Sequence, residues 1–246
     1  MRPGAELTVV LHQTRSPDNL GAVCRVMANF GFERLILSEP ITKDFGAAER
    51  MAVKSGHILS GMRVAPTLAE ALEDCVYVVG TTSRTQVVKR SPLTPEEAAR
   101  RLAEESTRGR VALLFGGEQR GLSDEDLTHC QDLLVIPTSD VQPSMNLAQS
   151  SAVLLYLCHR QGLGETAAVP AEAEPGAKLG TLGALSARMR AAMLAADFLN
   201  PQAPEHVLHE LERTLMRSRL TQREAELWLN AFKHLGRAVA PGSSRE

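Results

Sequence analysis

The chain has 246 residues, 43% of them hydrophobic and 23% charged, and a formal net charge of −2 at pH 7. This composition is ordinary for a soluble globular protein, and a chain of this length can bury a core without disulfides or metal ions. The slightly acidic balance argues against a protein that is basic throughout, so an RNA partner would have to meet local clusters of positive charge.

Short apolar runs recur along the first two thirds of the chain and predict β-strands. Each run is short and nearly continuously apolar, which is typical of strands covered on both faces of a sheet. The runs are Leu7–Leu11, Arg34–Leu37, Tyr77–Val79, Val111–Phe115 and Leu133–Ile136.

Helical signals lie between these runs. Asn19 is predicted to cap a helix that ends near Gly31, and Thr67 to open a short helix through a capping box. Thr94 precedes proline and two glutamates, the pattern of an N-cap followed by a first helical turn. Ser144 is predicted to cap a further helix. The alternation predicts an α/β fold with a mostly parallel sheet and helices on both faces.

The pattern changes near residue 160, which predicts three parts. Residues 1–160 form the α/β domain, and residues 161–180, rich in glycine, proline and acidic residues, form a flexible linker. Residues 181–246 form a small helical extension, in which Glu205–Arg217 and Thr221–Leu235 have helical periodicity.

Three polar or glycine-containing clusters adjoin predicted strand ends, where ligands bind in open α/β sheets. The first contains Asn19 and Arg25, the second Gly116-Gly117-Glu118, and the third Ser144-Met145-Asn146. Each alone also fits a simpler interpretation: a solvated helix arginine, a plain glycine turn, or helix capping. The second cluster is neither a dinucleotide-binding glycine fingerprint nor a phosphate-binding P-loop.

Together, in their order and spacing, the clusters resemble the three motifs of the SpoU/TrmH family of SPOUT-class RNA 2′-O-ribose methyltransferases. The resemblance covers the chain from Leu7 to about Arg160. The motifs are Asn19-x-Gly21-x-x-x-Arg25, Phe115-Gly116-x-Glu118-x-x-Gly121-Leu122, and Ile136-Pro137 followed by Ser144-Met145-Asn146-Leu147-Ala148. The C-terminal helices resemble the tail of the TrmJ branch, whose members methylate nucleotide 32, cytidine or uridine, in the tRNA anticodon loop.

This resemblance implies a deep trefoil knot at the C-terminal side of the α/β domain, with S-adenosyl-L-methionine bound in it, and a homodimer. The expected cofactor-binding residues are Thr81, Gly116, Gly117, Glu118, Ile136, Met145 and Leu147. Arg25 matches the catalytic arginine of the family, which activates or positions the ribose hydroxyl. Asn19, Glu118, Ser144 and Asn146 are expected to orient Arg25 and the ribose, and no metal is required.

Positive charge gathers in two places that could meet RNA. Arg84, Lys89 and Arg90 have no acidic residue between them. A second group of arginines lies at the junction of the two C-terminal helices. An ordinary solvated face is an equally good explanation for each group. The candidate RNA-binding residues are Arg84, Lys89 and Arg90.

The cysteines are far apart in sequence and form no C-x-x-C pair, which predicts buried thiols in a reducing cytosol and no zinc site. They are Cys24, Cys75, Cys130 and Cys158. We also expect no signal peptide and no membrane-spanning segment, and therefore a cytoplasmic protein.

Three alternatives to tRNA methylation in the anticodon loop stay open at this stage. The same chemistry could act on ribosomal RNA or on another tRNA position. The chain could be a non-catalytic RNA-binding module, although Arg25, Glu118 and Asn146 are all present. A dehydrogenase would need a glycine-rich loop after the first strand, where Ser16–Gly21 has a single glycine.

Overall fold

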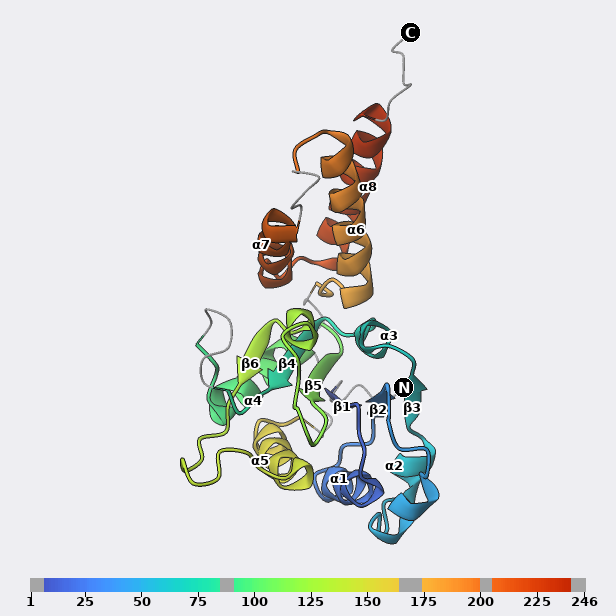
Figure 1. Ribbon diagram of the computed structural model, residues 1–246, viewed down its shortest axis with the longest axis vertical. Coiled ribbons are helices and arrows are strands. Elements are labelled where there is room, and N and C mark those ends of the chain that lie inside the picture. The colour runs from blue at the N-terminus through green and yellow to red at the C-terminus, as the bar shows by residue number, and fades with distance from the viewer. Residues whose placement is uncertain (1–6, 85–90, 164–173, 200–204, 240–246) are drawn as a thin grey trace. The chain divides into compact units, whose positions relative to one another are not determined.

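The computed structural model describes residues 7–84, 91–163, 174–199 and 205–239 of the chain. The chain separates into two compact units, Met1–Ala173 and Glu174–Glu246, and each is described by itself. Figure 1 shows their helices and strands.

The first unit contains a six-stranded sheet in the order β3-β2-β1-β5-β4-β6, with every neighbouring pair parallel. The prediction of a mostly parallel α/β sheet is therefore confirmed. The strands are β1 (Leu7–His12), β2 (Leu35–Ser38), β3 (Arg63–Ala65), β4 (Tyr77–Thr81), β5 (Val111–Phe115) and β6 (Asp132–Leu134). Sequence analysis did not predict β3, because this edge strand has three residues and two of them are exposed.

Helices cover both faces of this sheet, as predicted (Figure 1). Helices α1 and α5 pack on one face and α3 lies on the other. The helical elements of this unit are α1 (Pro17–Asn29), η1 (Gly46–Arg50), α2 (Gly56–Ser60), α3 (Leu68–Leu72), α4 (Pro95–Ser106), η2 (Asp126–His129) and α5 (Leu147–Arg160).

The core explains why the strands are continuously apolar. Every residue of β1 and β5 is buried. Alternate residues such as Val9, Leu113 and Phe115 join one core with residues of α1, α4 and α5. The residues between them, such as Val10 and Leu114, are also fully buried, because the opposite face is covered as well.

Two of the four predicted helix caps are confirmed and two are wrong. Thr94 forms the complete capping box and Thr67 accepts a hydrogen bond from the backbone of the third helical residue. The cap of α1 is Ser16, not Asn19, and the cap of α5 is Asn146, not Ser144. In each case a neighbouring polar residue in the same loop takes the capping role.

The second unit consists of helices α6 (Leu179–Ala195), α7 (Glu205–Arg217) and α8 (Gln222–Val239). The backbone N–H of Ala177 donates to the carbonyl of Leu220, 2.8 Å away, and brings the start of α6 beside the start of α8. Thus α6 begins inside the range predicted as a linker. Residues 164–173 of that range lie outside the described residues.

Candidate active site

The three sequence motifs meet at the carboxyl edge of the sheet. The first follows β1, the second follows β5 and the third follows β6. Strands β1 and β5 are neighbours, and β4 lies between β5 and β6. Because all strands are parallel, their carboxyl ends share one edge, where open α/β sheets bind their ligands.

The carboxylate of Glu118 links the second motif to the first. Its two oxygens accept hydrogen bonds from the backbone N–H groups of Arg15, at 3.0 Å, and Ser16, at 3.1 Å. The side-chain amide of Asn19 donates a third hydrogen bond at 3.3 Å. A carboxylate that accepts three N–H donors is a strong anchor for the loop that enters α1.

Asn19 and Asn146 link the first motif to the third. The Nδ2 of Asn146 donates to the Oδ1 of Asn19 at 2.9 Å. The Oδ1 of Asn146 accepts from the backbone N–H of Ala148 at 2.8 Å and thereby caps α5. A single chain of side chains, Glu118–Asn19–Asn146, therefore joins residues that lie 99 and 127 positions apart in sequence.

A tight hairpin follows β5 and carries the two glycines of the second motif. Gly117 and Gly121 form a bridge, in which the N–H of Gly121 donates to the carbonyl of Gly117 at 2.8 Å. A Cβ at Gly116 would lie 2.2 Å from the carbonyl carbon of Gly121. Glycine is thus required at position 116 by the hairpin itself, independently of any ligand.

Arg25 lies on the exposed side of α1, outside this network. The structure records no hydrogen bond or ion pair of its guanidinium with any described residue. Ser144 is also outside the network, since its nearest polar partner is the side chain of Gln142, at 3.4 Å from its hydroxyl. Of the five expected catalytic residues, the structure brings Asn19, Glu118 and Asn146 together and leaves Arg25 and Ser144 apart.

The expected cofactor-binding residues lie along the same edge. Thr81 ends β4 and is half-buried, as is Ile136, which follows β6. The turn after β4 is held beside β6, because the N–H of Thr82 donates to the carbonyl of Leu134 at 3.0 Å. Leu147 is the buried first residue of α5, and Met145 is exposed two residues before it.

Arg84, expected to bind RNA, has partners within the protein. Its guanidinium pairs with Asp124 at 2.8 Å and donates to the carbonyl of Leu122 at 2.8 Å. These contacts fasten the loop after β4 to the segment that follows the glycine hairpin. Lys89 and Arg90 lie outside the described residues.

Sequence analysis missed the groups that receive Glu118, because they are backbone N–H groups that any residue type supplies. It also missed His12, the buried last residue of β1. The Nδ1 of His12 lies 3.2 Å from the hydroxyl of Ser38, and its Nε2 lies 3.3 Å from a carboxylate oxygen of Asp126. These contacts connect the ends of β1 and β2 with η2, and His12 immediately precedes the loop that binds Glu118.

The cysteines are free and buried, as predicted. Burial raises the pKa of the Cys24 and Cys158 thiols to about 12, so both stay neutral and unreactive at physiological pH. Across the described ranges, no group of three His, Cys, Asp or Glu side chains is arranged to hold a metal ion. No helix within the same ranges is long and apolar enough to span a membrane.

Partial burial raises the pKa of Glu118. Hydrogen bonds from its own N–H, from Ser16 and Arg15 and from Asn19 lower the pKa by more than burial raises it, so the pKa lies below its ordinary value. Because this pKa is lower in the folded chain, the ionised carboxylate stabilises the fold fully at pH values above the ordinary glutamate pKa. This stabilisation is lost as the pH falls through the pKa of the folded state. We therefore expect the carboxyl carbon of Glu118, followed by ¹³C NMR, to titrate below a glutamate in an unstructured peptide.

The variant Asn19→Ala removes one of the donors and should move that titration upward, towards the ordinary value. A Glu118 titration at or above the ordinary value in the unmodified chain would contradict the network.

We expect Gly116→Ala to lower the free energy of unfolding by about 1–3 kcal/mol or more, because the added Cβ would overlap the backbone of Gly121. Thermal unfolding of the full chain measures the effect. Gly56→Ala is the matched control, since a Cβ at position 56 meets nothing within 4 Å. Equal stability of the two variants would show that the hairpin does not require glycine at position 116.

The chain is similar in sequence and structure to known RNA methyltransferases. The SpoU rRNA Methylase family matches residues 6–156. A relative in Pseudomonas aeruginosa (strain UCBPP-PA14), tRNA (cytidine/uridine/adenosine-2′-O-)-methyltransferase TrmJ, is 32% identical over 232 residues, which are 90% of each chain. The crystal structure of TrmJ from Z. mobilis ZM4 has a TM-score of 0.80 at 26% identity and covers 93% of this chain and 98% of that chain.

A second solved structure, described as giving insights into the 2-OH methylation of C/U34 on tRNA, has a TM-score of 0.50 at 29% identity. It covers 63% of this chain and 95% of that chain. The trefoil knot that the resemblance implies stays a prediction. Because the family matches more than half of the sequence, and a full-length relative and a solved structure agree, the chain belongs to the SpoU methylase family of methyltransferases, with relatives of the TrmJ type.

Proposed function

We propose that this methyltransferase modifies the ribose 2′-hydroxyl of tRNA and takes the methyl group from S-adenosyl-L-methionine. The observation that carries the proposal is the chain Glu118–Asn19–Asn146, which assembles the three family motifs at one edge of the sheet. The TrmJ relatives, named as tRNA 2′-O-methyltransferases, support tRNA as the substrate.

The carboxyl edge fits a cofactor that is held largely by backbone groups. It offers half-buried glycine backbone at Gly116 and Gly117, half-buried Thr81 and Ile136, and buried Leu147. Met145 and Glu118 complete the proposed set. The cofactor would supply an electrophilic methyl group on sulfur, and the deep trefoil knot of the family would enclose it.

We propose a positioning role for Glu118. Its carboxylate is ionised at physiological pH and accepts backbone and amide hydrogen bonds, so it is not placed to take the proton of the ribose. Asn19 and Asn146 would orient the loop and the ribose, and Ser144 would contact the ribose from the loop before α5.

Arg25 remains available for the substrate. Its guanidinium is exposed and carries five N–H donors, for which the structure shows no acceptor within the described residues. Because a guanidinium with a pKa above about 12 is a poor base, Arg25 would mainly position the hydroxyl and stabilise its developing charge. Alignment of two large substrates supplies much of the rate enhancement in such a reaction.

We propose nucleotide 32 of the anticodon loop, cytidine or uridine, as the target. The TrmJ relatives from Pseudomonas aeruginosa and Cronobacter sakazakii each align with 90% of this chain, whereas the structure concerned with C/U34 covers 63% of it. The match to these two relatives extends over more of the chain than the match to the C/U34 structure, which favours a target of the TrmJ type. Ribosomal RNA is the second candidate substrate, because the matching family model is described as an rRNA methylase.

The proposed enzyme acts as a cytoplasmic homodimer, with Lys89 and Arg90 as RNA contacts. Helix α5 exposes Val153 and Tyr156, which fits burial against a second copy. Arg84, already paired with Asp124, would act on RNA through the loop that it fastens.

The direct test incubates the full-length chain with labelled S-adenosyl-L-methionine and unmodified tRNA, or with ribosomal RNA, and maps the product by mass spectrometry. We expect a 2′-O-methyl group at tRNA nucleotide 32. A 2′-O-methyl group elsewhere would keep the chemistry and change the target. Absence of transfer to either RNA would favour a binding module over an enzyme.

We expect Arg25→Ala to lose methyl transfer by several orders of magnitude while calorimetry shows unchanged S-adenosyl-L-methionine binding. Cofactor binding should persist because Arg25 is exposed and makes no hydrogen bond or ion pair within the described residues. The matched control is Arg100→Ala, which removes an exposed guanidinium from α4. Among the described residues this group pairs only with Glu104, four residues along the same helix. Wild-type turnover by Arg25→Ala would remove this residue from the mechanism.

A further inference from the structure

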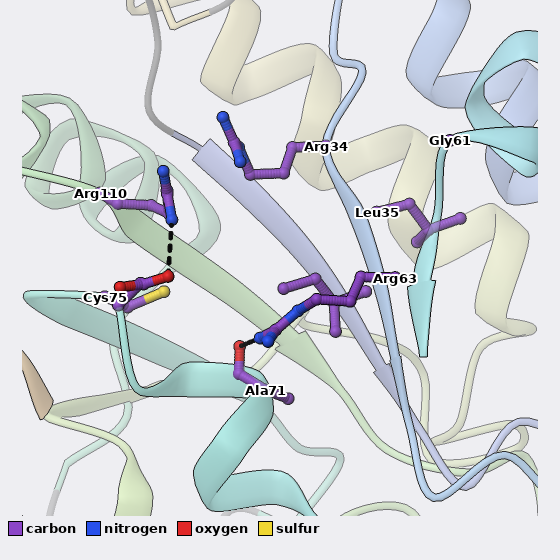
Figure 2. A pocket seen from close by; sticks show the side chains of 9 residues that line it. Arg34, Leu35, Gly61, Arg63, Ala71, Cys75 and Arg110 are labelled. Carbon is purple, nitrogen blue, oxygen red and sulfur yellow. Dashed lines mark hydrogen bonds and ion pairs between the residues drawn. The ribbon is translucent and has the colours of Figure 1, made fainter. Parts of the chain in front are cut away.

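A second cluster of charged side chains lies at the opposite edge of the sheet from the motifs. Arg34 precedes β2, Arg63 opens β3 and Arg110 precedes β5, so all three lie where strands begin. Together with Asp74 and Cys75 they line one cavity of about 190 Å³ (Figure 2). The six residues of β1 place roughly 20 Å between the two edges, so this cavity is separate from the methyl-transfer site.

Two of the three guanidinium groups are held by contacts within the protein. Arg63 donates to the carbonyl of Glu70 at 2.8 Å and lies 3.5 Å from the carboxylate of Glu73. Arg110 pairs with Asp74 at 3.2 Å. These contacts fix the positions of both guanidinium groups at the cavity.

Arg34 differs from the other two. Its backbone carbonyl accepts a hydrogen bond from Val9 at 3.0 Å, which fixes the residue at the start of β2. Its side chain is exposed, and the structure shows no hydrogen bond or ion pair of its guanidinium within the described ranges. Arg34 therefore brings to the cavity a guanidinium group whose N–H donors have no acceptor among the described residues.

The cysteine in the cavity does not offer nucleophilic chemistry. Burial raises the pKa of Cys75 to about 12, although the positive charges of Arg110, Arg34 and Arg63 act in the opposite direction. The thiol is neutral at physiological pH and hence a poor nucleophile. All three arginines and this thiol line the same cavity.

We propose that Arg34, Arg63 and Arg110 form a binding site for a phosphate group. Planar guanidinium forks match the oxygens of phosphate and bind it with charge-assisted hydrogen bonds. The cavity of about 190 Å³ is smaller than the roughly 300–1,000 Å³ of sites for drug-sized ligands, so it suits one phosphate group and not a whole dinucleotide. The phosphate could belong to the RNA backbone, which rests on the proposed function, or to a small phosphorylated molecule.

The first test titrates the full-length chain with inorganic phosphate and follows backbone amide signals by NMR. We expect saturable shifts at Leu35 and Gly61 in the cavity wall. Arg34→Gln should weaken the binding at least about tenfold, the effect of losing one charge-assisted hydrogen bond. Arg100→Gln makes the same change of charge on α4 and should titrate like the unmodified chain. Equal shifts in Arg34→Gln and the unmodified chain would contradict the site.

The second test identifies the source of the phosphate by measuring tRNA affinity at increasing salt concentration. If the RNA backbone occupies the site, Arg34→Gln should reduce the slope of log affinity against log salt by about one, and Arg100→Gln should not. An unchanged slope together with lost phosphate binding would indicate a small phosphorylated molecule. If neither measurement responds to Arg34→Gln, the proposal is wrong.

These tests are independent of the proposed methyl transfer. The phosphate titration needs neither tRNA nor S-adenosyl-L-methionine, so it would stand even if the chain acted on a different RNA. Conversely, a chain that methylates tRNA but ignores phosphate and keeps its salt slope in Arg34→Gln would retain the proposed function and lose only the second site.

Discussion

The carboxylate of Glu118 holds the candidate active site together. The loop after β1 and the hairpin after β5 are far apart in sequence, and their strands give them adjacent starting points but no fixed geometry. Glu118 fixes the position of the loop relative to the hairpin, because its side chain binds two consecutive backbone N–H groups, at Arg15 and Ser16, and the amide of Asn19. The same contacts keep the carboxylate ionised, so the anchor is strongest in the pH range where a cell operates.

The polar residues of the motifs differ in whether their side chains are hydrogen-bonded within the protein. The side chains of Glu118, Asn19 and Asn146 form hydrogen bonds with one another and with the backbone. Arg25 makes no such contact within the described residues, so its donors are available for the proposed contact with the substrate. A rigid amide and carboxylate framework suits the proposed reaction, in which alignment matters more than proton transfer.

The parallel sheet gives the first unit two edges of different character. Every strand points the same way, so all carboxyl ends, with their glycine and amide loops, lie at one edge, and all amino ends lie at the other. The amino edge collects Arg34, Arg63 and Arg110 around one cavity. Although the chain as a whole is slightly acidic, positive charge is thus concentrated locally, which is what binding of a polyanion requires.

The sequence by itself determined the class of fold, because buried parallel strands need continuous apolar runs and all five such runs contain a strand. It also revealed the family, since motif order and spacing are properties of the chain. It could not decide which polar residue caps a helix: Ser16 and Asn146 do so where Asn19 and Ser144 were expected. The side chain of Asn19 is instead bonded to Glu118 and Asn146. These contacts, and the convergence of the arginines on one cavity, depend on distances between strands, which only the tertiary structure sets.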